Sequence, residues 1–240
     1  QDTEDSSLSN SASTPTSLWD GLSHAHKSLL DLYGFDTFKR HINFYYGQWA
    51  VSRPTNWLIR ALALKLISRG RLPWPAQVDW SDTENIHWPH GGSKNWIRLR
   101  SYALYCGLLW QYAKLSDKVG CLELPEPVYG SPMPIWFKGR LISQDLALSS
   151  LDINRMAEVI SFKPGMKVLE IGAGYGRLAY ALTSLFDVDY TIVDIEPALT
   201  VARKYLGCDY RFRSPSDLDG ANRTYDLVIN VSSFDEMPKD

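Results

Sequence analysis

The sequence of 240 residues lacks the features that mark several large classes of protein. Its three cysteines, Cys106, Cys121 and Cys208, are too few and too widely spaced for a disulfide framework or a zinc site. The longest mostly apolar stretches, such as residues 58–67, are too short to span a bilayer and are interrupted by basic residues. We therefore expect a protein of the reducing cytoplasm, with no metal site and no membrane partner.

A surplus of positive charge is also missing. The chain has 25 Lys and Arg against 27 Asp and Glu, which gives a net charge of −2 at pH 7, and no long basic run occurs. Nucleic-acid-binding chains usually carry a basic footprint, so we expect no nucleic-acid partner. His87 and His90 have a proline between them and no nearby acid completes a metal site, so we expect a surface or structural role for them rather than metal binding.

Composition divides the chain near residue 140. Residues 1–16 are rich in Ser, Thr and Asp, which predicts a flexible tail. Residues 17–140 hold all nine tryptophans and predict a mainly helical amino-terminal region. We expect helices over 18–33, 36–49 and 55–69, with Gly70 after the last of them. Proline-rich connections separate these helices from their neighbours.

A longer helix is predicted to begin near Ser93, because apolar residues recur there at steps of three and four. We expect this stripe, together with most of the tryptophans, to form the amino-terminal core. Its members are Trp96, Leu99, Ala103, Cys106, Trp110 and Ala113.

Residues 141–240 predict an α/β domain. Ser143 is placed to cap a helix that leads into it. Strands and helices then alternate, with strands at 167–171, 190–193, 210–212 and 225–231, and helices at 177–186 and from Pro197 to Gly207. This alternation predicts a doubly wound, Rossmann-like parallel sheet with the strand order 3-2-1-4. The fourth strand would lie at an edge although its composition suits a central strand, so we expect the sheet to be incomplete and the sequence to be part of a longer protein.

A glycine-rich turn follows the first of these strands, in "VLEIGAGYGRLAY". Its spacing is G-x-G-x-G, and Arg177 stands where the dinucleotide fingerprint G-x-G-x-x-G needs its third glycine. A bulky side chain there argues against NAD. The Lys-Ser/Thr pair of a phosphate loop is also absent.

The turn instead resembles motif I of the class I methyltransferases that use S-adenosylmethionine, (E/D)-x-G-x-G-x-G. Asp194 ends the second strand, where that family places an acid on the ribose hydroxyls, and a carboxylate can accept both hydroxyl protons. The alternative is that the glycines only shape a turn and Asp194 caps the next helix. The resemblance implies a cofactor site made of Glu170, Gly172, Ala173, Gly174, Tyr175, Gly176, Asp194, Ile195 and Asn230.

Residues 125–240 resemble, more narrowly, the sugar O-methyltransferase family. The similar segments include "EPVYGSP", "GRLISQDLALSSLD" and "YDLVINVSSFDEMP", and the last of these matches the family's Asn-x-x-Ser-Phe-x-Glu-Met pattern from Asn230 to Met237. This resemblance implies methyl transfer to a hydroxyl of a sugar or glycosylated small molecule. Residues before about 120 resemble no family that we can name.

Methyl transfer to a hydroxyl also requires removal of a proton. Asp235 and Glu236 follow the fourth strand, at the edge where open α/β sheets bind ligands, and are our candidates for the catalytic base. Glu236 also fits a capping box with Ser233, and a purely structural role for it is equally supported. Gln144 and Asp145 are secondary site candidates. The alternative function is a nucleotide-binding or scaffold module with the same fold but no activity, and no feature of the sequence predicts the oligomeric state.

Overall fold

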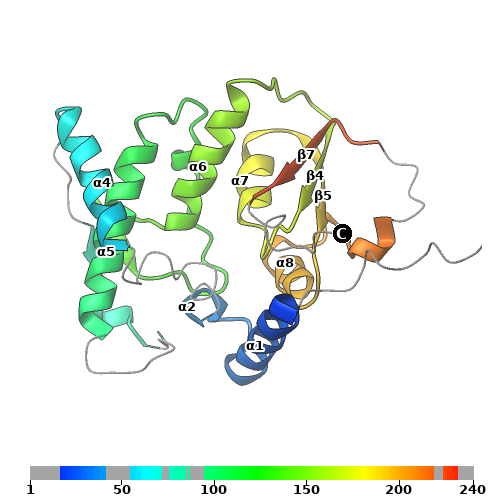
Figure 1. Ribbon diagram of the computed structural model, residues 1–240, viewed down its shortest axis with the longest axis horizontal. Coiled ribbons are helices and arrows are strands. Elements are labelled where there is room, and N and C mark those ends of the chain that lie inside the picture. Colours follow the sequence, from blue (N-terminus) through cyan, green and yellow to red (C-terminus); the bar gives the residue numbers. More distant parts are fainter. Residues whose placement is uncertain are drawn as a thin grey trace, which may run out of the picture.

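A group of helices lies at one end of the molecule, and a parallel sheet with further helices beside it lies at the other (Figure 1). The computed structural model describes residues 17–41, 55–71, 76–84, 86, 95–218 and 224–231. The helices are α1 (Ser17–Tyr33), α2 (Phe38–His41), α4 (Thr55–Ser68), α5 (Asn95–Ala113), α6 (Gln144–Ala157), α7 (Arg177–Leu185) and α8 (Ala198–Leu206). Three short 3-10 turns are η2 (Trp80–Asp82), η3 (Cys121–Glu123) and η4 (Pro215–Leu218).

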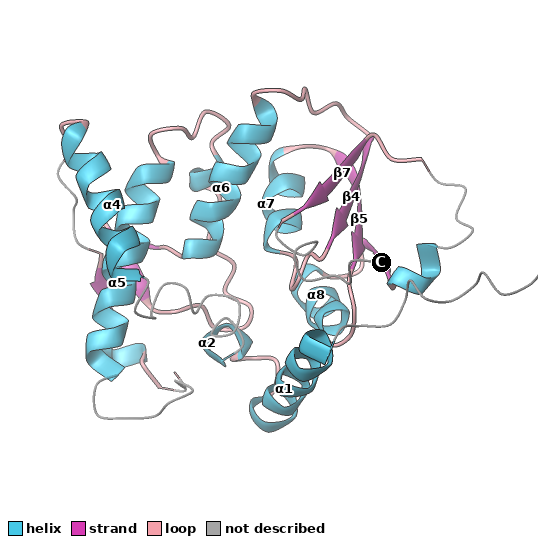
Figure 2. Cartoon of the chain, viewed as in Figure 1, coloured by secondary structure: helices cyan, strands magenta, loops and turns pink. Residues whose placement is uncertain are grey.

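The parallel sheet confirms the predicted fold class and strand order. Its four strands lie in the order β6-β5-β4-β7, and all neighbouring pairs are parallel (Figure 2). Ile171 pairs with both Val193 and Asn230, so the carboxyl ends of three strands meet at one edge. The strands are β4 (Met166–Ile171), β5 (Val188–Val193), β6 (Arg211–Arg213) and β7 (Leu227–Asn230).

The predicted helix signals act as expected where they are described. Gly70 follows α4 with a φ of +67°, the left-handed conformation that ends many helices. The Ser143 side chain accepts a hydrogen bond from the Leu146 amide at 3.1 Å, and it therefore caps α6 as predicted. Most of the helix predicted over 36–49, and the predicted start at Ser93, lie outside the described residues.

A second, antiparallel sheet was not predicted. It consists of β1 (Gln77–Val78), β2 (Ile135–Phe137) and β3 (Arg140–Leu141), in that order. The sequence pattern instead predicts proline-rich connections here. Strands of two or three residues are too short for an apolar alternation to be visible, and their pairing joins segments distant in sequence. The boundary predicted at residue 141 falls within β3, and it stays a prediction.

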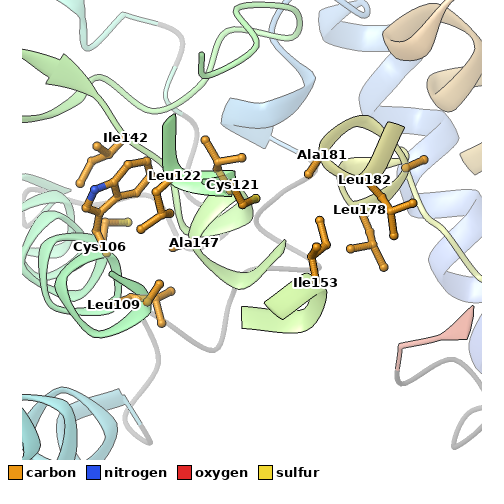
Figure 3. Packing of buried hydrophobic residues seen from close by; sticks show 14 of the residues in the cluster. Cys106, Leu109, Cys121, Leu122, Ile142, Ala147, Ile153, Leu178, Ala181 and Leu182 are labelled. Atoms are coloured by element: carbon orange, nitrogen blue, oxygen red, sulfur yellow. The ribbon is translucent and has the colours of Figure 1, made fainter. Parts of the chain in front are cut away.

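One hydrophobic core connects the amino-terminal helices to the sheet, and α6 lies at its centre (Figure 3). Cys106 of α5 and Leu122 of η3 belong to the same buried cluster as Ile153 of α6 and Leu182 of α7. Helix α6 packs against both α5 and α7. Helix α6 therefore links α5 to the helix that covers the sheet.

The prediction that most of the tryptophans build the amino-terminal core is wrong for four of the five whose side chains the structure describes. Trp110 is buried, whereas Trp57, Trp80, Trp96 and Trp136 are exposed by 65%, 46%, 51% and 39%. The other members of the predicted α5 stripe are buried. Because α5 is apolar around most of its circumference, a spacing of three and four residues does not by itself identify the face that packs.

Gly130 is a position where the fold depends on glycine. Its φ is +77°, and a methyl group added there would lie 2.0 Å from the ring of Phe38, which is 1% exposed. Gly139 has a similar φ of +78° but open space around it, so it is a matched control. We expect Gly130→Ala to lower the free energy of unfolding by about 1–3 kcal/mol more than Gly139→Ala. Urea unfolding measures both, and equal losses would contradict the packing of Phe38 on this loop.

Candidate site at the carboxyl edge of the parallel sheet

The glycine turn between β4 and α7 uses each of its glycines. Gly172, Gly174 and Gly176 have φ values of +74°, +59° and +91°, which favour glycine over other residues. A methyl group at Gly176 would lie 2.5 Å from Leu206, so this glycine lets the start of α7 pack against α8. At Gly174 a methyl group would meet no atom within 4 Å. The backbone at Gly174 therefore borders open space, where a ligand has room to approach it.

Asp194 joins this turn to the end of β5. Its carboxylate accepts hydrogen bonds from the amides of Gly174 and Ile195, each at 2.7 Å. The alternative role as the cap of α8 is not what the structure has: Glu196 accepts from the Thr200 amide at 3.0 Å instead. A carboxylate has about four acceptor positions, so about two remain for a ligand's hydroxyl groups.

Burial makes Asp194 a weaker acid than usual. It is 8% exposed. This burial raises its pKa from 3.8 to about 6, and the two amide hydrogen bonds offset part of the effect. The ionised side chain would therefore be stabilised by a ligand that donates hydrogen bonds or carries positive charge.

Glu170, the acid of the predicted motif, lies in the interior. It is 3% exposed and accepts a hydrogen bond from the Tyr190 hydroxyl at 2.8 Å. Burial raises its pKa to about 7, while the Tyr190 hydrogen bond and the charge of Arg177 lower it. A direct contact between Glu170 and a cofactor stays a prediction.

The remaining predicted residues lie along the same edge or outside the described chain. The Asn230 amide donates to the Ile171 carbonyl at 3.0 Å, which ties the end of β7 to the end of β4. Ala173 is buried and Ile195 is half-buried. Asp235 and Glu236 lie outside the described residues, as do His87 and His90.

Comparisons with known proteins match this part of the chain. Residues 130–205 match the model of the family described as protein-L-isoaspartate(D-aspartate) O-methyltransferase. The cyclopropane-fatty-acyl-phospholipid synthases of two Escherichia coli strains, K12 and O6:H1, are each 30% identical over 87 residues. These matches cover 35% of this chain and 22% of the relative. The chain has the fold and the glycine motif of a class I methyltransferase.

Two solved structures are similar at low identity. Coclaurine N-methyltransferase bound to N-methylheliamine and SAH is 15% identical with a TM-score of 0.32, and the alignment covers 90% of this chain and 55% of that one. A mutant of MtNAS in complex with S-adenosylmethionine is 17% identical with a TM-score of 0.30, covering 90% of this chain and 72% of that one.

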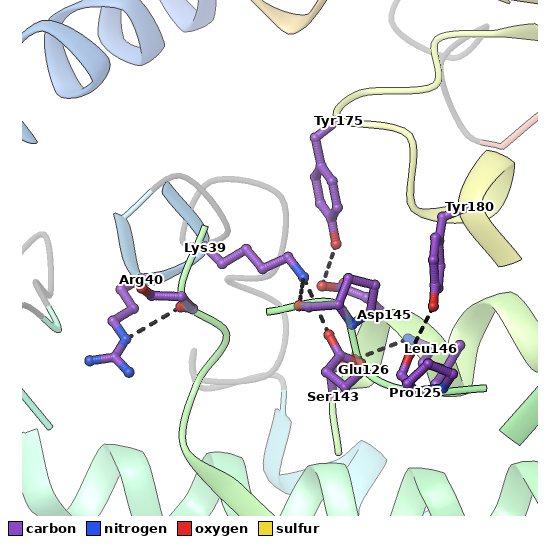
Figure 4. Close-up of polar contacts among 11 residues, drawn as sticks. Lys39, Arg40, Pro125, Glu126, Ser143, Asp145, Leu146, Tyr175 and Tyr180 are labelled. Atoms are coloured by element: carbon purple, nitrogen blue, oxygen red, sulfur yellow. Dashed lines mark hydrogen bonds and ion pairs between the residues drawn. The ribbon is translucent and has the colours of Figure 1, made fainter. Parts of the chain in front are cut away.

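Tyr175, inside the glycine turn, is held by residues from both halves of the chain (Figure 4). Its hydroxyl donates to the Asp145 carboxylate at the start of α6. Its ring packs edge-on against Phe38 and Tyr205, with centroids 5.2 and 5.0 Å away. The prediction of Asp145 as a secondary site residue thus gains a physical role, because Asp145 fixes a side chain of the turn.

A buried ion pair supports this arrangement from α2. Lys39 is 1% exposed, and its ammonium group lies 3.3 Å from Glu126 and 3.0 Å from the Pro127 carbonyl. The other carboxylate oxygen of Glu126 accepts from the Ser143 hydroxyl at 2.6 Å, at the cap of α6. Sequence analysis missed this pair, because its partners are 87 residues apart and no local pattern marks either.

Arg177 fastens α7 to α6. Its guanidinium donates to the Ser149 hydroxyl at 3.0 Å and pairs with the Asp152 carboxylate at 3.2 Å. The residue that departs from the dinucleotide fingerprint therefore has a structural function here. Within the described ranges, no three His, Cys, Asp or Glu side chains form a metal-binding group.

The burial of the Lys39–Glu126 pair leads to a prediction about stability. Lys39→Met leaves Glu126 buried without its cation, and we expect it to lower the free energy of unfolding by about 3–5 kcal/mol. Adding Glu126→Gln removes the unpaired charge and should recover much of this loss. Urea unfolding of the two single variants and the double variant measures the coupling. Losses that simply add would mean that the two groups do not interact.

The raised pKa of Glu170 leads to a prediction about how stability depends on pH. Because its folded pKa is raised from 4.5 to about 7, the stability linked to its proton is present below 4.5 and is lost as the pH rises through about 7. Glu170→Gln cannot ionise, and it should raise the free energy of unfolding by about 3 kcal/mol at alkaline pH and change it little in acid. Thermal or urea unfolding across this range measures the difference, with the exposed Glu158→Gln as the control. A variant whose loss of stability with pH parallels the parent's would contradict this assignment.

Proposed function

We propose that the chain is the cofactor-binding part of an S-adenosylmethionine-dependent O-methyltransferase. The observation that carries this proposal is the contact between the Gly174 amide and the Asp194 carboxylate, 2.7 Å apart, at the carboxyl edge of the parallel sheet. The turn is open at Gly174, and two acids of raised pKa lie at or beneath this edge. The methyltransferase family model that matches residues 130–205 also supports the proposal.

The residues present fit this cofactor. Asp194 would accept the two ribose hydroxyls at the positions that the backbone amides leave free. The glycine backbone would approach the amino-acid portion, and Tyr175, already fixed by Asp145, would not need to be ordered on binding. Asp194 and Glu170 favour a cation, because positive charge nearby lowers the cost of their ionisation. When bound, the cofactor supplies a methyl group on a sulfonium, which a nucleophile can take by in-line displacement.

We propose a hydroxyl of a sugar or glycosylated small molecule as the acceptor. The resemblance of residues 125–240 to the sugar O-methyltransferase family supports this class. Asp235 and Glu236 remain the candidates for the base that takes the hydroxyl proton, since they follow β7 along the same edge in sequence. Their positions lie outside the described residues, and both assignments stay predictions.

Calorimetric titration with S-adenosylmethionine and its demethylated product tests the cofactor. A folded chain that binds neither would refute the proposal. Transfer of labelled methyl to a panel of sugars and sugar nucleotides then tests the acceptor. Cofactor binding without turnover on any of them would favour the alternative, a binding or scaffold module with a methyltransferase fold.

Asp194→Asn tests the placement of the cofactor. The amide oxygen can still accept a backbone hydrogen bond, but the charged acceptor for two hydroxyls is lost. Each such bond contributes about 1.5–3 kcal/mol, so we expect the dissociation constant to rise by about a hundredfold or more. The exposed Asp209→Asn is the control and should bind like the parent. For the parent, affinity should fall as the pH drops through about 6 and Asp194 takes up a proton. Unchanged binding by Asp194→Asn would place the cofactor elsewhere.

A further inference from the structure

The outer face of α4 carries large apolar side chains. Leu62 and Leu66 are buried in the core, whereas Trp57, Leu64 and Ile67 are exposed by 65%, 58% and 52%. Trp57 and Leu64 are seven residues apart and lie on one face of the helix, with Ile67 three residues further on. A helix on a protein surface normally turns a polar face outward. This face of α4 is therefore built to contact something apolar.

Helices α4 and α5, together with the few residues that follow each of them, are also strongly basic. Residues 55–71 and 95–116 contain seven Lys and Arg and no acidic residue, so all 27 Asp and Glu lie elsewhere in the chain. The two helices pack together, and Lys65 of α4 donates to the Tyr112 hydroxyl of α5 at 3.0 Å. They form the end of the molecule opposite the parallel sheet (Figure 1). The basic residues are Arg60, Lys65, Arg69, Arg71, Arg98, Arg100 and Lys114.

The arrangement on α4 identifies the kind of partner. Arg60 lies three residues after Trp57 and four before Leu64, so a cationic side chain stands within the apolar face, and Arg69 and Arg71 follow its end. Exposed tryptophan and aliphatic side chains with basic residues among them are typical of helices that lie in the plane of a membrane surface. We propose that the outer face of α4 docks onto an anionic lipid bilayer.

Two other partners fit the surface less well. A second copy of the chain would bring a second group of seven like charges against the first, which opposes association. A nucleic acid would match the charge but would leave Leu64 and Ile67 in water, because its contacts are mainly to phosphates and base faces.

The proposal replaces the expectation that the chain has no membrane partner. That expectation rested on the absence of a spanning segment, and within the described part of the chain no helix has the length and apolarity to cross a bilayer. Docking on a surface needs neither, since one helix face and nearby basic side chains suffice.

Sedimentation of the full chain with vesicles tests the proposal. We expect binding to an equal mixture of phosphatidylcholine and phosphatidylglycerol, little binding to phosphatidylcholine alone, and weaker binding as salt is added. Arg60→Gln should weaken binding about fivefold, the loss of one basic residue at the surface. Trp57→Ser and Leu64→Ser should each weaken it by about tenfold.

Val159→Ser is the matched control, because Val159 is 83% exposed but lies just beyond the end of α6. It should bind vesicles like the parent. All three exposed apolar positions can be changed without opening the core, and unchanged thermal unfolding will confirm this. Equal weakening by Val159→Ser would mean that exposed apolar residues anywhere on the surface cause the binding, rather than the face of α4.

Three results would overturn the proposal. The first is a monomer that sediments with neither kind of vesicle. The second is a dimer that Trp57→Ser converts to a monomer, which would assign the face to a second copy. The third is a chain that binds poly(U) but neither kind of vesicle, which would make the surface of α4 and α5 a nucleic-acid-binding surface.

Discussion

The hydrogen bond from the Gly174 amide to the Asp194 carboxylate is the contact on which the candidate site depends. It joins residues 20 positions apart, and it exists because β4 and β5 pair in parallel with Ile171 opposite Val193. The residues that follow the two strands therefore emerge side by side. A shift in register would separate the acid from the turn while leaving both sequences intact. The position of Asp194 beside the turn thus depends first on how β4 and β5 pair, and only then on the glycines.

The amino-terminal helices complete this site rather than standing apart from it. Lys39 pairs with Glu126, and Glu126 accepts a hydrogen bond from Ser143 at the cap of α6. Two residues further along α6, Asp145 accepts a hydrogen bond from the Tyr175 hydroxyl. Each link is buried or nearly so, where an unpaired group costs most. Tyr175 inside the glycine turn also packs directly against Phe38, so the amino-terminal region, which resembles no family, helps to hold the turn.

The sequence predicts the features that have a local signal. Strands β4 and β5 are six-residue segments in which most residues are apolar, next to clear helix and turn residues, and Ser143 has a hydroxyl where a helix begins. The Lys39–Glu126 pair has no such signal, because a single Lys or Glu in a sequence is normally predicted to lie on the surface, whereas both of these are buried. The exposure of Trp57 was not predicted, because its helix is apolar on nearly every face. The spacing of apolar residues then indicates a helix but not which of its faces packs against the core.

Charge decides which ligand suits a turn that many nucleotide-binding folds share. Glu170 and Asp194 are both buried at this edge, and burial is the main cause that raises the pKa of each. The charge of Asp194 raises the pKa of Glu170 further. A ligand with phosphates would add negative charge beside them and hold both acids protonated. A ligand with a sulfonium and an ammonium group does the reverse, because its positive charge offsets the cost of ionising two carboxyls whose pKa values are raised by burial. The buried acids, more than the glycines, therefore favour S-adenosylmethionine over a dinucleotide.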